Sequence, residues 1–244
     1  MSNKEKVFCI GLSRTGTTSL CAALEELGYK TVHFSLGLFL NPQVIQPGLS
    51  FTPRQKLNWY WKRRLNSEIR YQNNIFPINF FDKYDAFGDL PIPLYYKQLN
   101  ELYPNAKFIY TYRDEENWLR SMEWLYGDGA VMWKHGLLDD EIKFSMYKSF
   151  KYDREKLIQS YRQHHKEVLH YFKDKENKCL VINIDETNLN FELLGKFLNV
   201  QWEEKTFPHV NSGLHQTYLK RADYWLGKEW VIYSLVKVIL SKLF

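Results

Sequence analysis

The sequence predicts an α/β fold with a mainly parallel central sheet that is doubly wound, with helices on both faces. Short apolar runs rich in β-branched and aromatic residues recur along the chain, and a helical pattern follows each of them. Strands that alternate with helices are typical of parallel sheets, because each parallel connection has to cross over the sheet. We see no linker or repeat, and therefore predict one domain over residues 1–244.

The first third of the chain begins with the clearest strand. Residues 7–10 form an apolar, β-prone run that ends at Gly11. A helix with leucine and alanine along one face follows, and Gly28 is a typical residue just past a helix C-terminus. Residues 30–34 are a second short strand. From about 35 to 80 we predict an irregular and partly helical insertion that is too long for a plain connection.

The middle of the chain alternates strand and helix twice. We predict a strand at 84–90, a helix at 94–102, and a central strand at 107–112. Asp114 is a good N-cap for the next helix, at 115–125.

The last part of the chain repeats this pattern and ends in an amphipathic segment. A long helix is predicted at 153–173, a buried strand at 178–184 and a short helix at 189–199. Residues 228–244 have polar residues along one helical face, and are too short to span a bilayer. This C-terminal helix is a candidate homodimer interface.

The composition indicates the kind of ligand and the cellular location to expect. The net charge of +5 suits an anionic ligand but is too small to indicate a nucleic-acid partner. The three cysteines, Cys9, Cys21 and Cys179, have no metal-site spacing and suit a reducing compartment. There is neither a signal-peptide pattern nor an 18-residue apolar run. We therefore expect a cytoplasmic protein without a transmembrane span.

The glycines after the first strand have the spacing of a nucleotide-binding P-loop, G-x-x-x-x-G-K-S/T, from Gly11 to Gly16. A strand, a glycine turn and a helix start direct backbone N–H groups at one point, which suits a phosphate. Thr17 occupies the lysine position, and Arg14 provides a cation three residues earlier. The loop is therefore poorly suited to triphosphate hydrolysis. A glycine turn without a ligand is the alternative, since such turns are common in α/β proteins.

A second phosphate site is predicted at the end of the 107–112 strand. Arg113 ends this strand, and Ser121 follows eight residues later, about 2.2 helical turns along the next helix. Arginine and serine there would bind a phosphate at the same sheet edge as the loop. Alternatively, Arg113 pairs with Asp114 or Glu116, and Ser121 is an ordinary helix residue.

Together these motifs resemble a known family. The run from Arg14 to Ser19, RTGTTS, resembles the 5′-phosphosulfate loop, K/R-S/T-G-T-T, of sulfotransferases that use 3′-phosphoadenosine 5′-phosphosulfate (PAPS). Arg113 and Ser121 match the family's 3′-phosphate pair. The resemblance covers about residues 5–215 and is closest to a branch outside the cytosolic drug-sulfating enzymes.

The resemblance implies transfer of a sulfuryl group from PAPS to a hydroxyl or amine, leaving adenosine 3′,5′-bisphosphate (PAP) and using no metal. The acceptor is expected to be a small molecule or a carbohydrate. Arg14 would also take part in catalysis by countering charge on the leaving phosphate. The implied nucleotide-binding residues are Ser13, Arg14, Thr15, Gly16, Thr17, Thr18, Arg113 and Ser121.

The acceptor needs a general base, for which the sequence offers two candidates. Asp89, at the end of the 84–90 strand, is the first, although it could instead cap a turn. His33, at the end of the second strand, is the second, although such a histidine is often only buried. Two other functions stay open: a P-loop small-molecule kinase or other nucleotide-binding enzyme, and a module that binds PAPS without turnover.

Overall fold

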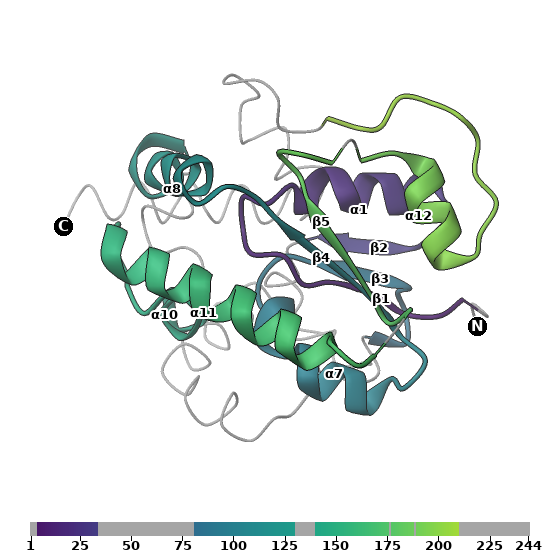
Figure 1. Cartoon of the computed structure of the whole chain (residues 1–244), viewed down its shortest axis with the longest axis horizontal. Helices are drawn as coiled ribbons and strands as arrows, with labels where there is room; N and C mark the ends of the chain where they lie inside the picture. Colours follow the sequence, from purple (N-terminus) through teal and green to yellow (C-terminus); the bar gives the residue numbers. More distant parts are fainter. Residues whose placement is uncertain (1–3, 34–80, 130–139, 176, 188, 210–244) are drawn as a thin grey trace, which may run out of the picture.

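Five parallel strands form the sheet at the centre of the molecule (Figure 1). The computed structural model describes residues 4–33, 81–129, 140–175, 177–187 and 189–209. The strands lie in the order β2-β3-β1-β4-β5, and every pairing is parallel. Their bounds are β1 Val7–Cys9, β2 Thr31–His33, β3 Ala86–Gly88, β4 Lys107–Tyr112 and β5 Cys179–Asn183. Because the chain starts at the centre and fills first one side and then the other, the sheet is doubly wound, as predicted.

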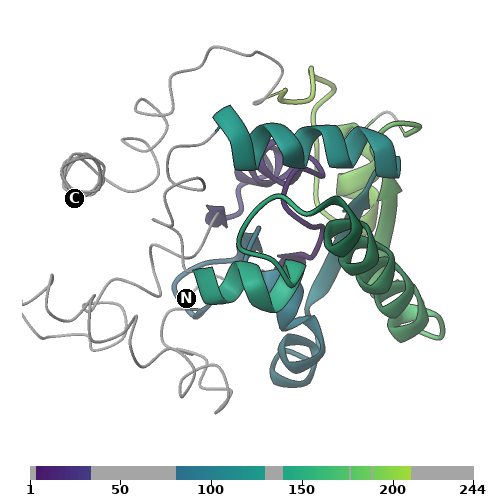
Figure 2. The same cartoon turned by 90° about the vertical axis from the view of Figure 1, so that its left-hand side faces the viewer.

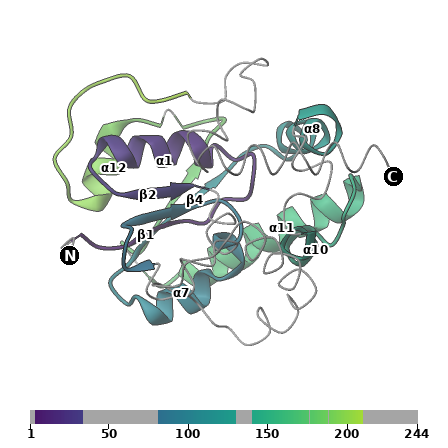
Figure 3. The same ribbon diagram turned by 180° about the vertical axis from the view of Figure 1, so that it is seen from behind.

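Helices cover both faces of the sheet, which confirms the predicted fold class. Helices α1 (Thr17–Glu26) and α12 (Phe191–Leu198) lie on one face, and α7 (Tyr96–Leu102) and α11 (Arg154–Phe172) lie on the other (Figures 1 and 3). Helices α8 (Glu115–Trp124) and α10 (Asp140–Tyr147) lie beyond the carboxyl ends of the strands. A 3₁₀ turn, η1 (Ile92–Leu94), precedes α7, and a π-helical segment, η2 (Leu125–Gly129), follows α8.

The central strand β1 shows why a strand at the middle of this sheet is apolar throughout. Val7 and Cys9 pack into the layer of α1 and α12, whereas Phe8 and Ile10 pack into the layer of α7 and α11. A parallel sheet covered on both faces buries alternate side chains on both sides, so no polar face remains. The continuous apolar runs in the sequence are the result.

A third core cluster lies beyond the carboxyl edge of the sheet and joins the surrounding helices. Trp118 of α8 packs against Tyr161 of α11, with ring centroids 4.5 Å apart, and Tyr147 of α10 belongs to the same cluster. Leu12 and Leu90, from the loops after β1 and β3, are buried among them. This apolar packing sets the position of both loops relative to α8 and α10.

Helix ends confirm two of the sequence predictions. Gly28 follows α1 with a positive φ of 79°, and the Asp114 carboxylate caps α8 by accepting 3.0 Å bonds from the backbone N–H groups of Glu116 and Asn117. Helix α7 begins at Tyr96 rather than at 94, because residues 92–94 form the 3₁₀ turn after Pro91. Within the described ranges, no helix is long and apolar enough to cross a membrane.

Several predictions fall outside the described residues. The insertion predicted at 35–80 and the amphipathic helix predicted at 228–244 lie there. The single-domain organisation and the homodimer interface therefore stay predictions.

The buried His164 of α11 gives the fold a pH dependence. Its Nε2–H donates to the carbonyl oxygen of Ile10 at the end of β1, at 2.9 Å, and burial lowers its pKa to about 4. An unfolded histidine titrates near 6.5, so the unfolded state binds the extra proton as the pH falls from about 6.5 to about 4. The free energy of unfolding should fall by about 3 kcal/mol from this group over that window.

Urea unfolding of the wild type and of His164→Gln at pH 7, 6, 5 and 4 checks this prediction. The glutamine keeps an N–H donor and cannot titrate, so the stability difference between the two proteins should shrink as the pH falls. Parallel pH profiles would contradict it.

Candidate functional site

The loop between β1 and α1 packs closely against the end of β4. A Cβ atom on Gly11 would lie 2.2 Å from Thr111 Oγ1 and 2.6 Å from the Thr111 carbonyl oxygen, so only glycine fits there. Gly16 has a φ of 82° and is the N-cap of α1. Figure 2 views this end of the sheet, where the strands finish. The loop thus places the positive end of α1 at the carboxyl edge of the sheet, as the motif predicts.

The side chain of Thr15 turns into the loop. The hydroxyl of Thr15, fully buried, donates to the carbonyl oxygen of Leu12 at 2.7 Å and lies 3.1 Å from Thr111 Oγ1. Thr15 N also donates to Leu12 O, at 3.2 Å. Thr15 therefore closes the loop on itself through both its side chain and its backbone.

Ser13 is held by three other elements of the fold. Its backbone N–H donates to the hydroxyl of Tyr147 at 3.2 Å, and its carbonyl oxygen accepts from Trp118 Nε1 at 3.0 Å. Its hydroxyl donates to Asp89 Oδ1 at 2.7 Å. Burial raises the pKa of Tyr147 well above its usual value, so this phenol stays neutral. The backbone of the loop at Ser13 is thus fixed by α8 and α10.

The two base candidates, Asp89 and His33, lie together. His33 is the last residue of β2 and pairs with Gly88, the last residue of the neighbouring parallel strand β3, which Asp89 follows. Asp89 Oδ2 lies 3.9 Å from His33 Nε2, and that nitrogen lies 3.2 Å from the hydroxyls of both Thr17 and Thr18. The structure therefore joins both candidates to the phosphate loop.

Asp89 begins a turn, as the sequence allowed as an alternative, because its carbonyl oxygen accepts from Ile92 N at 3.0 Å; its carboxylate also contacts the phosphate loop. The N-cap of η1 is Pro91, and the Asp89 carboxylate, largely buried, accepts from Ser13 Oγ and from Leu90 N through the same oxygen, Oδ1. Oδ2 can therefore still accept a hydrogen bond from a further donor.

Arg14 reaches from the loop to α8. Its Nε donates to Ser121 Oγ at 2.8 Å, and its guanidinium carbon lies 5.0 Å from the centroid of the Trp124 ring, a cation–π contact. Ser121 and Trp124 are one helical turn apart and so share a face of α8. The predicted 5′-phosphate cation and the predicted 3′-phosphate serine are therefore in direct contact.

Arg113 has a partner that the sequence did not suggest. Its Nη2 lies 3.0 Å from Asp185 Oδ1, in the loop after β5, whereas the alternative partners have other roles: Asp114 caps α8, and Glu116 pairs with Arg154. Within the part of the chain that the structure describes, no hydrogen bond joins Arg113 to Ser121. They share one sheet edge, and each is bonded to a different residue.

Four residues around the site were not predicted from the sequence. They are Trp118, Trp124, Tyr147 and Asp185. The first three come from helices, where a residue's spacing does not reveal a contact with a distant loop. Asp185 did carry a signal, because it directly follows the strand predicted at 178–184, much as Asp89 lies at the end of the strand predicted at 84–90.

No group of three or more His, Cys, Asp or Glu side chains in the described ranges is arranged to hold a metal ion. The absence of a metal requirement stays an expectation from the resemblance.

Comparison with protein families identifies the chain. A family model described as "Sulfotransferase domain" matches residues 6–215. The protein belongs to this sulfotransferase family. The Ava biosynthesis cluster protein M of Aspergillus versicolor is 33% identical over 123 residues, which cover 48% of this chain and 42% of that protein. The match thus spans less than half of that relative's length.

Solved structures of low similarity complete the comparison. A sulfotransferase from Alicyclobacillus acidocaldarius is 14% identical with a TM-score of 0.43, and the match covers 98% of this chain and 96% of that one. A sugar kinase from a Janibacter species is 15% identical with a TM-score of 0.37, covering 81% and 95%. These scores are too low to support an argument about function.

The close contact at Gly11 predicts that replacing Gly11 by alanine lowers the stability much more than replacing Gly127. Gly11→Ala should lower the stability by about 1–3 kcal/mol, because the new methyl group overlaps Thr111, including its backbone. Gly127→Ala is the matched control, because a Cβ there meets nothing within 4 Å. Chemical denaturation of both variants checks the prediction, and equal stabilities would show that the loop does not need this close approach.

Proposed function

We propose that this sulfotransferase moves a sulfuryl group from PAPS to a hydroxyl or amine of a small-molecule or carbohydrate acceptor and releases PAP. The observation that carries the proposal is the contact between Arg14 and Ser121. It places residues that resemble the 5′-phosphate loop and the 3′-phosphate site of PAPS-dependent enzymes next to each other, in a chain of the sulfotransferase family. Their positions in the sequence, 107 residues apart, do not predict this contact.

The residues at the loop fit a phosphate group. The helix α1 begins at Thr17 after a glycine without a side-chain cap, so the first backbone N–H groups and the helix dipole favour an anion. Arg14 adds a charge that makes strong hydrogen bonds to phosphate oxygens. We assign the 5′-phosphate to Gly16, Thr17, Thr18 and Arg14, with Ser13 and Thr15 maintaining the loop's shape.

PAPS, when bound, supplies a sulfuryl group whose bond to the 5′-phosphate oxygen breaks as the acceptor oxygen or nitrogen attacks the sulfur. In this scheme Arg14 counters the negative charge that grows on the 5′-phosphate. Arg113 and Ser121 hold the 3′-phosphate, and so orient the nucleotide.

Asp89 is the residue that we propose as the general base. Its Oδ1 is bonded to Ser13 and Leu90, so the acceptor's proton would move to Oδ2. His33, 3.9 Å from that oxygen, is the second candidate. Asp89 is buried, which limits competition from water for the same proton.

The alternative is a small-molecule kinase. It would need a lysine, or an equivalent charge, where Thr17 stands, and the family match favours sulfuryl transfer. A module that binds PAPS without turnover is distinguished only by assay. A cytoplasmic location stays a prediction, supported by three cysteines that are free thiols.

Titrations with PAP, and separately with ATP and magnesium, test which nucleotide the protein binds. We expect the wild type to bind PAP and Arg113→Ala to bind it on the order of tenfold or more weakly, since hydrogen bonds to charged groups contribute about 1.5–3 kcal/mol. Calorimetry measures both. Binding of ATP with magnesium but not of PAP would overturn the sulfotransferase proposal and favour the kinase.

Asp89→Asn tests the base. Turnover can be followed as PAP release from PAPS in the presence of pooled phenol, alcohol, sugar and amine acceptors. We expect this variant to lose about 10²–10⁴-fold in kcat while its affinity for PAP changes little, because the amide keeps the size of the carboxylate and cannot take the proton. Full turnover in Asp89→Asn would exclude Asp89 as the base, and His33→Asn would then be the variant to test.

A further inference from the structure

The carboxylate of Asp185 bonds to Arg113 and to the start of α8, the helix that carries Ser121. We propose that Asp185 is a positioning residue that orients Arg113 and anchors the start of α8, so that the site selects nucleotides carrying a 3′-phosphate. This inference rests on the proposed function, since it concerns the same nucleotide site. It adds a residue that neither the sequence motifs nor the family match singled out.

The three hydrogen-bond donors to Asp185 all come from the junction of β4 and α8. Oδ1 accepts from Arg113 Nη2 at 3.0 Å, and Oδ2 accepts from Asp114 N at 2.8 Å and from Asn117 Nδ2 at 3.1 Å. The parallel register explains the proximity. Tyr112 at the end of β4 pairs with Asn183 at the end of β5, and Ile184 N donates to Tyr112 O at 2.8 Å.

Asp185 is held in its charged form. Burial raises its pKa, but the hydrogen bonds from Asn117, Asp114 and Arg113, together with the charge of Arg113, outweigh burial and lower the pKa below its ordinary value. A charged acceptor bonded to three donors is a stronger anchor than a neutral one.

The backbone and the side chain of Arg113 are both restrained, but its Nε–H donor is not satisfied within the described part of the chain. Its N–H and carbonyl groups are both bonded to the hydroxyl of Tyr161, and Asp185 holds Nη2. Its Nε is buried and has no acceptor among the residues that the structure describes. A buried donor without an acceptor is costly, and an oxygen of a bound phosphate would satisfy it.

Asp185 also acts on Ser121 through α8. By bonding to Asp114 and Asn117 it anchors the first turn of this helix, on which Ser121 lies about a turn further on. Asp185 therefore contributes to the position of Ser121 relative to Arg113, together with the packing of α8.

A carboxylate beside Arg113 could also compete with the phosphate for it. Two of the three donors to Asp185 belong to Asp114 and Asn117, so these bonds can hold the carboxylate in place while Arg113 binds a phosphate. The contacts to α8 are what favour positioning, and the two roles predict opposite effects of removing the carboxylate.

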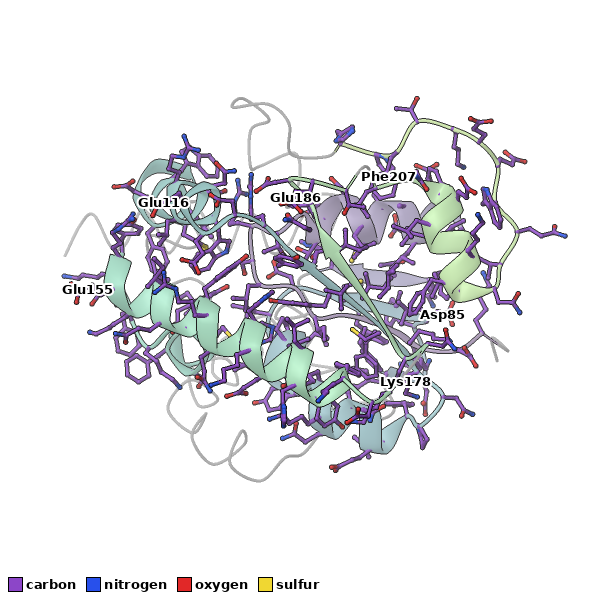
Figure 4. All side chains as sticks on the ribbon, viewed as in Figure 1. Asp85, Glu116, Glu155, Lys178, Glu186 and Phe207 are labelled. Carbon is purple, nitrogen blue, oxygen red and sulfur yellow. The ribbon has the colours of Figure 1, made fainter. Side chains whose placement is uncertain are left out.

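Affinities for PAP and for adenosine 5′-monophosphate test the proposal, because the two ligands differ in the 3′-phosphate. We expect Asp185→Ala to reduce the preference for PAP on the order of tenfold, with the monophosphate bound as in the wild type. Asp185→Asn should restore a part of the preference, since its amide oxygen still accepts a hydrogen bond. Glu186→Ala is the matched control, with the same loss of charge one residue later; Figure 4 labels Glu186 at the end of β5.

The preference for PAP over the monophosphate is measured first in the wild type and in Arg113→Ala. If the wild type shows no preference for PAP, or Arg113→Ala keeps it, the proposed nucleotide site itself fails. If that site stands, three results overturn the role of Asp185: an unchanged preference in Asp185→Ala, a stronger one, or an equal loss of affinity for both nucleotides. The last result would mean that Asp185 only supports the fold, a conclusion that Asp185→Asn checks independently.

Discussion

The contact between Gly11 and Thr111 is the constraint on which the site depends. Because Gly11 has no side chain, the loop after β1 can lie directly against the end of β4. From there Ser13 reaches Asp89 at 2.7 Å, and Arg14 reaches Ser121 at 2.8 Å. A larger residue would lift the loop away from the sheet and lengthen both contacts. The hydrogen bonds of the site thus depend on the close contact with Thr111 that Gly11 allows because it has no side chain.

Two residues of the site have a strained backbone. Arg14 and Asp89 have φ angles of 72° and 65°, in the left-handed region that residues other than glycine seldom adopt. Such conformations cost on the order of 1–3 kcal/mol each and persist only where their surroundings hold them. Here the surroundings are the bonds to Ser121 and Ser13, so the stability of the folded core maintains two residues in the conformations that the proposed chemistry uses.

Local patterns along the chain predicted the fold well. Apolar runs, Gly28 and the Asp114 cap located the described strands and every described α-helix except α10 to within a few residues, because buried parallel strands and helix ends have strong local preferences. The same patterns placed Arg14, Asp89 and Arg113 at strand ends. Since the carboxyl ends of parallel strands meet at one edge, their grouping followed from the fold class.

The sequence by itself determined which residues gather at the carboxyl edge, and only the tertiary structure decided which of them touch. Arg113 was expected beside Ser121, or paired with Asp114 or Glu116, but its partner is Asp185, and Ser121 bonds to Arg14. Tyr147 and Trp118 hold Ser13 across more than one hundred residues of chain. Spacing along one helix or strand predicts which side chains share a face. A pairing between elements depends on the register of β5 against β4 and on the packing of α8 and α10, which no local pattern encodes.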